Sequence, residues 1–359
     1  MPNSTKDSTK ALTQLLGVEL PIVQAPMAGG PDTPALAAAV SNAGGLGSLG
    51  CAYLSASKIE AIAAEMRRLT ARPFALNLFV RPDERDEPDD AAARARVLPL
   101  LREFRRELGL PETATVAPAA ADSFAAQLEA VLRARPRVFS FTFGVPTRAE
   151  VAALQARQIV VVGTATTVEE ADALAALGVD AISAQGAEAG GHRGTFLGRF
   201  EDALVGTMAL VPQLARRVRV PVIAAGGIVD GRGIAAALTL GAAGAQLGTA
   251  FMVCPEAGTP AAHRAALTSS RALQTVVTRA FSGRAARGIR NRFSDAFAEI
   301  AAAPFPEQQR LTAEIRAAAA ARGNVELMQL WAGQGAPLVR TMAAAALVET
   351  LAREAGLAS

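Results

Sequence analysis

The sequence VDAISAQGAEAGGHRG, residues 179–194, shows how the chain is organised. Residues 179–184 form a short apolar run that predicts a buried strand, and glycines crowd the segment that follows. These glycines allow the backbone to come close to a bound molecule. His192, one of only 2 histidines in the chain, lies among them. A glycine-rich loop with a lone imidazole after a strand is typical of the active site of an α/β barrel.

Similar apolar runs recur along the chain, and predicted helices separate them. The predicted strands are residues 22–24, 46–49, 74–79, 138–143, 159–162, 181–184, 220–224 and 245–247. The predicted helices are residues 34–40, 57–69 with Ser57 as N-cap, 123–132, 148–155, 168–177 with Thr167 as N-cap, 203–216 and 232–240. Buried strands that alternate with helices predict a parallel sheet, most simply a (β/α)8 TIM barrel.

The alternation loosens after residue 254. Residues 256–270, 293–303 and 307–322 are predicted helices that do not fit a barrel repeat, and residues 336–352 form a closing helix. We therefore predict a barrel domain from residues 11–254 and 334–359, with a small helical cap of residues 255–333 on the substrate side. Residues 80–118, which contain the charged run RPDERDE, are interpreted as a surface insertion without a site.

Composition excludes several classes of protein. The 359 residues are 51% hydrophobic with a net charge of +3 and 4% aromatic residues, so neither a basic phosphate-binding stripe nor a base-stacking surface is expected. Cys51 and Cys254 are too few for a disulfide framework and lack metal-ligand spacing. No signal peptide or membrane span is predicted. We expect a cytoplasmic protein, monomeric or homodimeric, without a metal, nucleic-acid or membrane partner.

The distribution of lysine excludes one kind of chemistry. Lys6, Lys10 and Lys58 are the only lysines of the chain. A Schiff base or amine nucleophile is therefore excluded beyond residue 58.

Two glycine motifs follow the last two predicted strands, in the sequences AAGGI (224–228) and QLGTA (246–250). The loops after these strands of a TIM barrel commonly bind phosphate through backbone N–H groups. Glycines in tight turns are the simpler interpretation, but two motifs on adjacent strands favour a phosphate site. The sequence GLGSLG (45–50) also matches G-x-G-x-x-G, yet a helix precedes it and the glycines enclose the strand, which disfavours a dinucleotide site.

Several single residues also allow more than one interpretation. His192 could be a buried structural histidine, but the glycines at 190, 191 and 194 leave it few packing partners and favour a function. His263 lies on a polar helical segment and is assigned no role. Trp331 is expected to pack the cap onto the barrel, and Glu188 to join a hydrogen-bond network within the loop.

With these pieces placed, the whole chain resembles the nitronate monooxygenases, once called 2-nitropropane dioxygenases. The resemblance runs through PIVQAPM (21–27), AGGLG (43–47), ALNLF (75–79), QGAEAGGHRG (185–194), AGGI (225–228), QLGT (246–249) and WAGQG (331–335). The loop around His192 is also similar to that of the flavin-dependent enoyl-acyl carrier protein reductases. Gln-Ala-Pro-Met after the first strand, together with Asn77 and Gln185, favours the nitronate branch.

The resemblance implies an FMN site and a reaction. Ala25, Pro26 and Met27 would pass the flavin ring, Asn77 and Gln185 would bind its polar edge, Gly190 would let the loop approach it, and Gly226, Gly227, Gln246, Leu247, Gly248 and Thr249 would hold its phosphate. His192 would face the substrate as the catalytic residue. The implied reaction is the oxidation of alkyl nitronates, such as propionate 3-nitronate, by O2 to a carbonyl compound and nitrite.

Three alternatives remain open at this point. The first is an FMN-dependent NAD(P)H reductase of quinones or enoyl thioesters, which would oxidise NADH under nitrogen. The second is a flavin-free lyase or isomerase of a sugar phosphate, which would purify colourless. The third is a non-catalytic flavin-binding protein, in which no nitro compound or nicotinamide would reduce the flavin.

Overall fold

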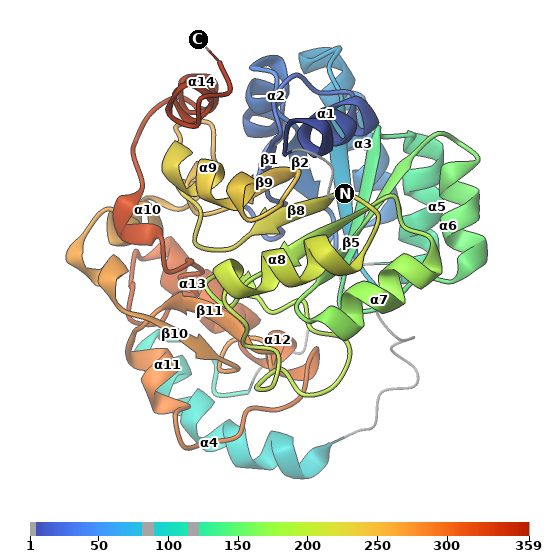
Figure 1. The fold of residues 1–359 in the computed structure, drawn as a ribbon. Helices are drawn as coiled ribbons and strands as arrows, with labels where there is room; N and C mark the ends of the chain where they lie inside the picture. Colours follow the sequence, from blue (N-terminus) through green and yellow to red (C-terminus); the bar gives the residue numbers. More distant parts are fainter. Residues whose placement is uncertain (1–4, 81–89, 114–121, 359) are drawn as a thin grey trace.

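The computed structural model describes residues 5–80, 90–113 and 122–358. Its centre is a parallel sheet of eight strands in the order β1-β9-β8-β6-β5-β4-β3-β2 (Figure 1). The strands are β1 (Ile22–Gln24), β2 (Gly47–Gly50), β3 (Phe74–Phe79), β4 (Val138–Thr142), β5 (Val160–Ala165), β6 (Ala181–Gln185), β8 (Val222–Ala225) and β9 (Gly244–Leu247). A parallel bridge between Val23 and Leu46 joins the first and last strands of this order. The predicted TIM barrel is therefore confirmed.

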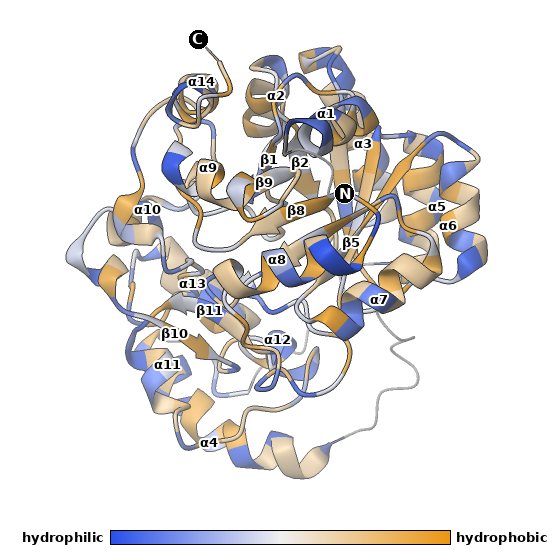
Figure 2. Cartoon of the chain, in the orientation of Figure 1, coloured by the Kyte–Doolittle hydropathy of each residue, from blue (hydrophilic) through white to orange (hydrophobic). Residues whose placement is uncertain are grey.

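Helices surround the barrel and pack their apolar faces on the strands (Figure 2). They are α2 (Pro34–Asn42), α3 (Ala56–Leu69), α5 (Phe124–Ala134), α6 (Arg148–Gln155), α7 (Val168–Leu177), α8 (Thr207–Arg217), α9 (Gly231–Thr239) and α14 (Ala344–Glu354). Thr167 caps α7, as predicted, by accepting a hydrogen bond from the backbone N–H of Glu170. The N-cap of α3 is Ser55 and not Ser57, because the Ser55 hydroxyl accepts the Lys58 N–H.

Helix α1 (Thr5–Leu16) closes the N-terminal end of the barrel. Leu12 and Leu16 are fully buried there against inward-facing residues of the strands, among them Val23 and Val138. This apolar plug leaves only the opposite end, where the strands finish, for a site. Catalytic residues of TIM barrels lie at that C-terminal end.

The cap contains a sheet as well as helices, so the purely helical cap expected from the sequence is corrected. Strands β10 (Thr275–Thr278) and β11 (Ala286–Ile289) pair in antiparallel fashion, and β11 pairs in turn with β7 (Gly191–His192) of the glycine-rich loop. The helical elements of the cap are α10 (Ala261–Leu267), α11 (Arg292–Ala296), α12 (Glu307–Leu311), α13 (Ala313–Ala321) and the short 3₁₀ turn η3 (Ser270–Leu273), and a further 3₁₀ turn, η2 (Phe251–Val253), precedes the cap.

Helix α4 (Ala91–Glu107) belongs structurally to the cap, although it lies far from it in sequence (Figure 1). Val97, Leu101 and Phe104 are buried in the same apolar cluster as Phe293 and Ile315. The interpretation of residues 80–118 as a surface insertion is therefore wrong for this helix. The charged run RPDERDE itself (81–87) lies outside the described residues.

Several predicted helix boundaries also differ. The helix expected at 203–216 begins only at Thr207, with Gly206 as its N-cap, and the one expected at 256–270 is confined to α10, which starts after Pro260. The helix expected at 293–303 ends at Ala296. Residues 336–352 divide into the 3₁₀ turn η4 (Ala336–Leu338) and the later helix α14.

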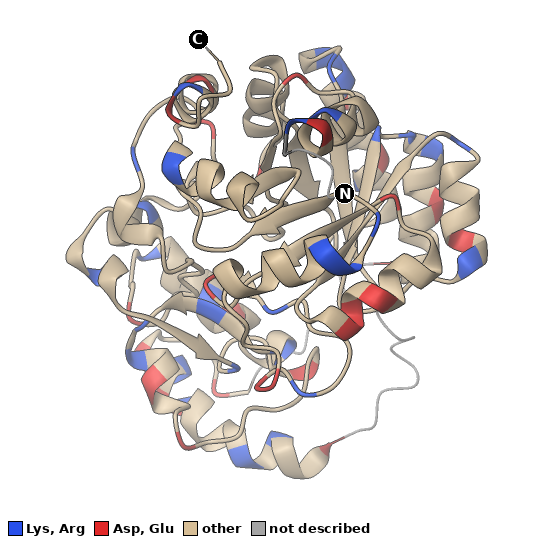
Figure 3. Ribbon diagram, in the orientation of Figure 1, with Lys and Arg blue, Asp and Glu red and all other residues tan. Residues whose placement is uncertain are grey.

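The surface offers no concentration of charge in the view of Figure 3, where basic and acidic side chains are interspersed over the helices. Among the described residues, no helix combines the length and apolar character needed to cross a bilayer.

Candidate active site

A cavity of about 530 Å³ lies where the strands end, between the barrel and the cap. Its walls include Ala25, Pro26, Met27, Asn77, Gln185, Gly190, His192, Gly226, Gly227, Gln246, Gly248 and Thr249. These predicted residues, spread over the sequence, are thus brought together in one place. Leu247 is the exception, because its side chain is 1% exposed and packs in the barrel core.

The loop after β1 is held in place by Asp32. The Asp32 carboxylate accepts hydrogen bonds from the backbone N–H of Met27 at 2.7 Å and of Gly50 at 2.6 Å. Burial raises the pKa of Asp32 to about 6, and the two N–H donors partly oppose this rise. Asp32 therefore positions the segment that forms one wall of the cavity.

The glycines of GLGSLG have a packing role. A Cβ atom at Gly47 would lie 1.9 Å from the carbonyl oxygen of Ala37 in α2, and one at Gly50 would lie 2.5 Å from the Ala28 nitrogen. These two glycines let β2 approach a helix and the loop after β1. This agrees with the view that the motif is not a dinucleotide site.

Two turns, after β8 and β9, form a cradle lined by backbone. Gly226 and Gly227 have φ values of 112° and 75°, in the left-handed region that favours glycine. Among the described residues, the N–H groups of Gly226, Gly227, Gly248 and Thr249 have no hydrogen-bond acceptor. Free N–H groups that converge on a cavity form an anion site without a basic side chain. The residues present therefore fit one phosphate group.

The polar wall opposite this cradle comes from β3, β4 and β6. The Asn77 amide donates to the Ser140 hydroxyl at 2.9 Å. Ser183 lines the same wall, and its buried hydroxyl has no partner among the described residues. Gln185 braces the loop, because its amide donates to the His192 carbonyl at 3.1 Å and its oxygen accepts the Gly194 N–H at 2.8 Å. Ser183 and Asn77 are thus placed to bind a polar ligand edge.

Gly190 brings the loop against the backbone of the cap. A Cβ atom there would lie 2.5 Å from the nitrogen of Gly333, within WAGQG. The Gly333 N–H donates to the Thr249 hydroxyl at 3.0 Å, and the Gln334 N–H donates to the Glu188 carbonyl at 2.9 Å. The structure thus explains Gly190 by its contact with the cap.

Charged side chains brace the same loop from behind. The Glu188 carboxylate accepts from both the N–H and the hydroxyl of Thr207 at 2.9 Å, which confirms the predicted loop network. Arg193, only 1% exposed, donates to the carbonyl oxygens of Gln185 and Gly186. Its position next to His192 was not singled out from the sequence.

Among the residues that the structure describes, one polar group contacts the ring of His192. Its Nε2 lies 2.8 Å from the Ser282 hydroxyl, which is itself positioned to donate its one proton to the Arg284 carbonyl oxygen at 3.1 Å. In that arrangement the hydroxyl accepts from the Nε2–H of the imidazole. This arrangement favours the tautomer with its proton on Nε2 and a lone pair on Nδ1.

The rest of the imidazole lies among aromatic rings. The ring centroids of Phe143 and Trp331 are 5.6 and 5.5 Å from that of His192, and Phe79 and Phe305 lie slightly further away. Burial, followed by the positive charges of Arg284 and Arg316, lowers the pKa of His192 to about 3. The histidine is therefore neutral at physiological pH.

The cavity is also lined by residues that were not predicted from the sequence to belong to a site. Tyr53, Arg316 and His263 line it, and the Nε2 of His263 contacts the Trp331 carbonyl oxygen at 3.1 Å. Trp331 therefore joins the cap to the barrel, as expected, and also forms a wall of the cavity. A lone arginine in the alanine-rich helix α13 was the signal that could have identified Arg316.

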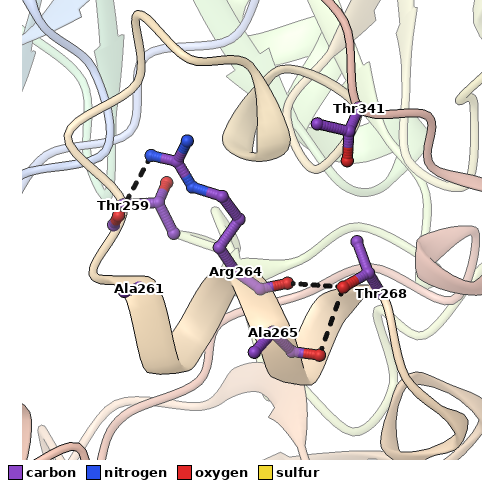
Figure 4. A pocket seen from close by; sticks show the side chains of 6 residues that line it. All are labelled: Thr259, Ala261, Arg264, Ala265, Thr268 and Thr341. Atoms are coloured by element: carbon purple, nitrogen blue, oxygen red, sulfur yellow. Dashed lines mark hydrogen bonds between the residues drawn. The ribbon is translucent and has the colours of Figure 1, made fainter.

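A second hollow, of about 490 Å³, lies beside α10 and is shown in Figure 4. Arg264 crosses it and donates to the carbonyl oxygens of Ala257 and Thr259. None of the predicted site residues lines it.

The fold and the site together define a TIM-barrel enzyme in which two glycine turns and a buried histidine line one cavity. A sequence model described as nitronate monooxygenase matches residues 9–354. The nitronate monooxygenase of Pseudomonas aeruginosa is 47% identical, with 96% of this chain and 99% of the relative covered. A probable nitronate monooxygenase of Staphylococcus saprophyticus is 40% identical over 96% of this chain and 97% of its own.

Solved structures agree with these relatives. A nitroalkane oxidase from Streptomyces ansochromogenes superimposes with a TM-score of 0.90 at 42% identity, covering 96% of this chain and 98% of that chain. FabK from Thermotoga maritima superimposes with a TM-score of 0.73 at 28% identity, covering 96% and 95%. The chain belongs to the nitronate monooxygenase family.

Proposed function

We propose that the protein oxidises alkyl nitronates with O2, using FMN, to a carbonyl compound and nitrite. The observation that carries the proposal is the placement of a neutral histidine and a backbone phosphate cradle in the same cavity. The similarity to nitronate monooxygenases and to a nitroalkane oxidase supports the same activity. Propionate 3-nitronate is the substrate that we would test first.

The cavity fits FMN because its cradle offers four free N–H groups to one terminal phosphate. Gly226, Gly227, Gly248 and Thr249 would hold that phosphate, while Asn77 and Ser183 would meet the polar edge of the ring. Ala25 and Met27 would lie beside the ring, on the segment that Asp32 positions. When bound, the flavin supplies the redox chemistry, and the protein supplies position and electrostatics.

His192 would act on the proton of the substrate. Its Nδ1 lone pair would take the acidic α-proton of a neutral nitroalkane. Because burial lowers the pKa of the ring to about 3, this step would require the nitronate anion formed beside the ring to stabilise the imidazolium. A nitronate has already lost this proton and needs no base. The aromatic rings around His192 limit the water that could compete for the lone pair.

The alternative is an FMN-dependent NAD(P)H reductase of quinones or enoyl thioesters, and the similarity to FabK is the observation in its favour. It is less supported, because identity and structural similarity are both higher to the nitroalkane oxidase. Oxidation of NADH under nitrogen, with a quinone as acceptor, separates the two. The nitronate reaction does not require a nicotinamide.

A cytoplasmic location and a monomeric or homodimeric state belong to the same proposal. Cys51 and Cys254 are both free and buried, in accord with a reducing compartment. Light scattering of the purified protein would give the oligomeric state.

The visible spectrum of the purified protein tests the proposal as a whole. We expect a yellow protein whose released cofactor has the mass of FMN, and whose flavin absorbance changes when propionate 3-nitronate is added without air. Nitrite should then accumulate once O2 is admitted. A protein with FAD or no flavin, or a flavin that only NADH reduces, would contradict the proposal.

A further inference from the structure

The segment that follows His192 has no helix or strand of its own to hold it. Residues 193–196 are irregular, so their backbone groups need partners from other elements. The Arg193 N–H donates to the Ala285 carbonyl oxygen at 2.8 Å, which continues the pairing of β7 with β11 by one bond. Beyond this bond the segment depends on side chains.

Arg284 holds two carbonyl oxygens of this segment. It lies just before β11 in the cap, and its Nε donates to the Arg193 carbonyl oxygen at 3.4 Å. One of its terminal nitrogens donates to the Thr195 carbonyl oxygen. The guanidinium thus bridges two alternate residues, and the rigid fork of its donors suits this arrangement.

A carboxylate holds the same segment through its N–H groups. Glu170, completely buried in the first turn of α7, accepts the Leu197 N–H at 2.9 Å and the Phe196 N–H. Its other oxygen accepts from the N–H and the hydroxyl of Thr166. Burial lowers the pKa of Arg284 to about 10, and the negative charge of Glu170 partly opposes this fall. The two opposite charges therefore act on one short stretch of backbone.

The guanidinium of Arg284 also lies over the ring of Phe143. Its Cζ atom is 3.8 Å from the ring centroid, a cation–π contact. Phe143 lines the cavity, and its ring is 5.6 Å from that of His192 at an angle of 83°. Phe143 has a φ of 79°, which is unusual for a bulky residue and persists only where the surroundings fix it. Arg284 does not line the cavity described above, so an aromatic ring lies between its charge and the ligand space.

The charges that act on the imidazole have one sign. After burial, Arg284 and then Arg316 of α13 disfavour its protonation. The carboxylates near this loop, Glu170 and Glu188, are engaged by backbone N–H groups. Tyr53 lines the same cavity with its ring against that of Phe79. The aromatic side chains packed on the imidazole have no titratable group: Phe79, Phe143, Phe305 and Trp331.

We propose that Arg284 is a positioning residue for His192, which fixes the orientation of the imidazole through the segment that follows it and keeps the ring uncharged from across Phe143. The inference goes beyond the proposed function, because it concerns the state of one side chain and holds for any reaction in the cavity. Carbonyl oxygens and an aromatic face hold the guanidinium without neutralising its charge. A protonated His192 would place a second cation near it, which is unfavourable.

The two histidines of the chain make the test direct. NMR spectra of the FMN-loaded protein, with histidine labelled at its ring nitrogens, report the charge and the tautomer of each imidazole. His263 is an internal reference, because burial lowers its pKa to about 4 against the hydrogen bond to Trp331, without a contribution from an arginine. Both rings should be neutral in the native protein from pH 7 to about pH 5.

Arg284→Gln removes the charge that acts across Phe143. We expect the ratio of charged to neutral His192 at about pH 5 to become roughly tenfold larger, which corresponds to a pKa higher by about 1. The same ratio for His263 should change by less than about twofold. An unchanged ratio for His192 would overturn the proposal.

Glu170→Gln tests whether the effect comes merely from a looser segment that admits water. This variant weakens the acceptor of the Phe196 and Leu197 N–H groups but removes no positive charge. Amide exchange of residues 194–197 should become about tenfold faster, the effect of one weakened hydrogen bond. The charged fraction of His192 should not rise, because loss of a negative charge disfavours the imidazolium. An equal rise in both variants would overturn the proposal.

Arg284→Lys keeps the charge but cannot hold both carbonyl oxygens with one planar fork. His192 should therefore stay as neutral as in the native protein, while amide exchange of residues 194–197 increases about tenfold. A lysine variant in which His192 is as charged as in the glutamine variant would overturn the role of the charge. Native exchange rates in this variant would overturn the role of the two carbonyl contacts.

Arg279→Gln is the matched control. Arg279 belongs to the same hairpin and also lies over a phenylalanine, at 4.8 Å from the ring centroid of Phe200, but it is exposed and pairs with Glu201. Its loss should change the His192 ratio by less than about twofold. A tenfold change here would overturn the assignment to Arg284. None of these measurements needs turnover, so a protein that oxidises no nitronate would contradict the proposed function and leave this test in place.

Discussion

The Nε2 atom of His192 lies 2.8 Å from the hydroxyl of Ser282, which is 90 residues further along the chain. Ser282 is completely buried and is itself positioned to donate to the carbonyl oxygen of Arg284. The serine thus sets which ring nitrogen carries the proton, and with it the ability of Nδ1 to accept one. The orientation of His192, on the loop after β6, therefore depends on a residue of the cap.

Ser282→Ala should impair proton abstraction more than redox turnover. Without the hydroxyl, the imidazole loses the partner that selects its tautomer, and we expect kcat for nitroethane to fall by about tenfold, the effect of one lost hydrogen bond. Turnover of ethyl nitronate, which needs no base, should fall much less. Steady-state assays with both substrates measure this, and Ser269→Ala at the N-cap of η3 in the cap serves as control. A loss of the same size on both substrates would mean that Ser282 only supports the fold.

His192→Asn tests the histidine itself. A general base contributes about 10²–10⁴-fold to a proton-transfer step, so turnover of a neutral nitroalkane should drop within that range. The matching nitronate should lose far less, and FMN content should stay at the native level, because the cradle lies on other residues. The comparison is made within one variant, so a general loss of folding cannot imitate it. If neither substrate is affected, His192 is a structural residue.

Substitutions in the cradle should release the cofactor. A Cβ atom at Gly248 would lie 3.5 Å from Ala25, an ordinary contact, so the protein itself accommodates Gly248→Ala. The added methyl would nevertheless stand in a turn whose N–H groups are assigned to the phosphate, and flavin content after gel filtration should fall. Gly227→Val should have a larger effect, because its φ of 75° disfavours a branched residue. Full flavin retention in both variants would place the phosphate elsewhere.

Acid should destabilise the protein through its histidines. Burial lowers the pKa of His192 to about 3 and that of His263 to about 4, against about 6.5 in an unfolded chain. The stability contributed by these neutral rings is therefore present above pH 6.5 and is lost as the pH falls towards the folded pKa values. His192→Gln should flatten the fall of the thermal midpoint between pH 7 and pH 4. An unchanged slope would contradict the burial of His192 in the neutral form.

Protonation of Asp32 should stabilise the folded protein over part of this pH range, in contrast to the histidines. Its pKa of about 6 in the folded protein exceeds the unfolded value of 3.8, so protonation adds stability as the pH falls from 6 to 3.8. Asp32→Asn removes this compensation and should steepen the acid loss. Thermal unfolding curves of the same pH series measure it, and a shallower slope would contradict the raised pKa.

The barrel could be predicted because its signal is local. Each strand is a short apolar run between a turn and a helix, and β1 and β3 begin and end at the predicted residues. The glycine turns after β8 and β9 could be assigned for the same reason. The sequence order of strands and helices alone then brings their ends together at one face.

The sheet of the cap could not be predicted in this way. Strand β7 is only two residues long, Gly191–His192, and has no apolar periodicity of its own. It exists because β11 pairs with it from a distant part of the chain. Ser282 and Arg316 could not be predicted from the sequence for the same reason. Neither belongs to a motif, and both reach the cavity region only when the cap folds against the barrel.

The pairing of β7 with β11 also determines when the site can be completed during protein synthesis. When His192 leaves the ribosome, the strand that aligns it and the serine that selects its tautomer have not yet been made. The barrel strands before it are already present, and long-range pairings form late because their loops must close first. A nascent chain that stops before residue 282 would therefore hold most of a barrel with an unaligned histidine. The contacts that align His192 are therefore complete only when the last quarter of the polypeptide has been made.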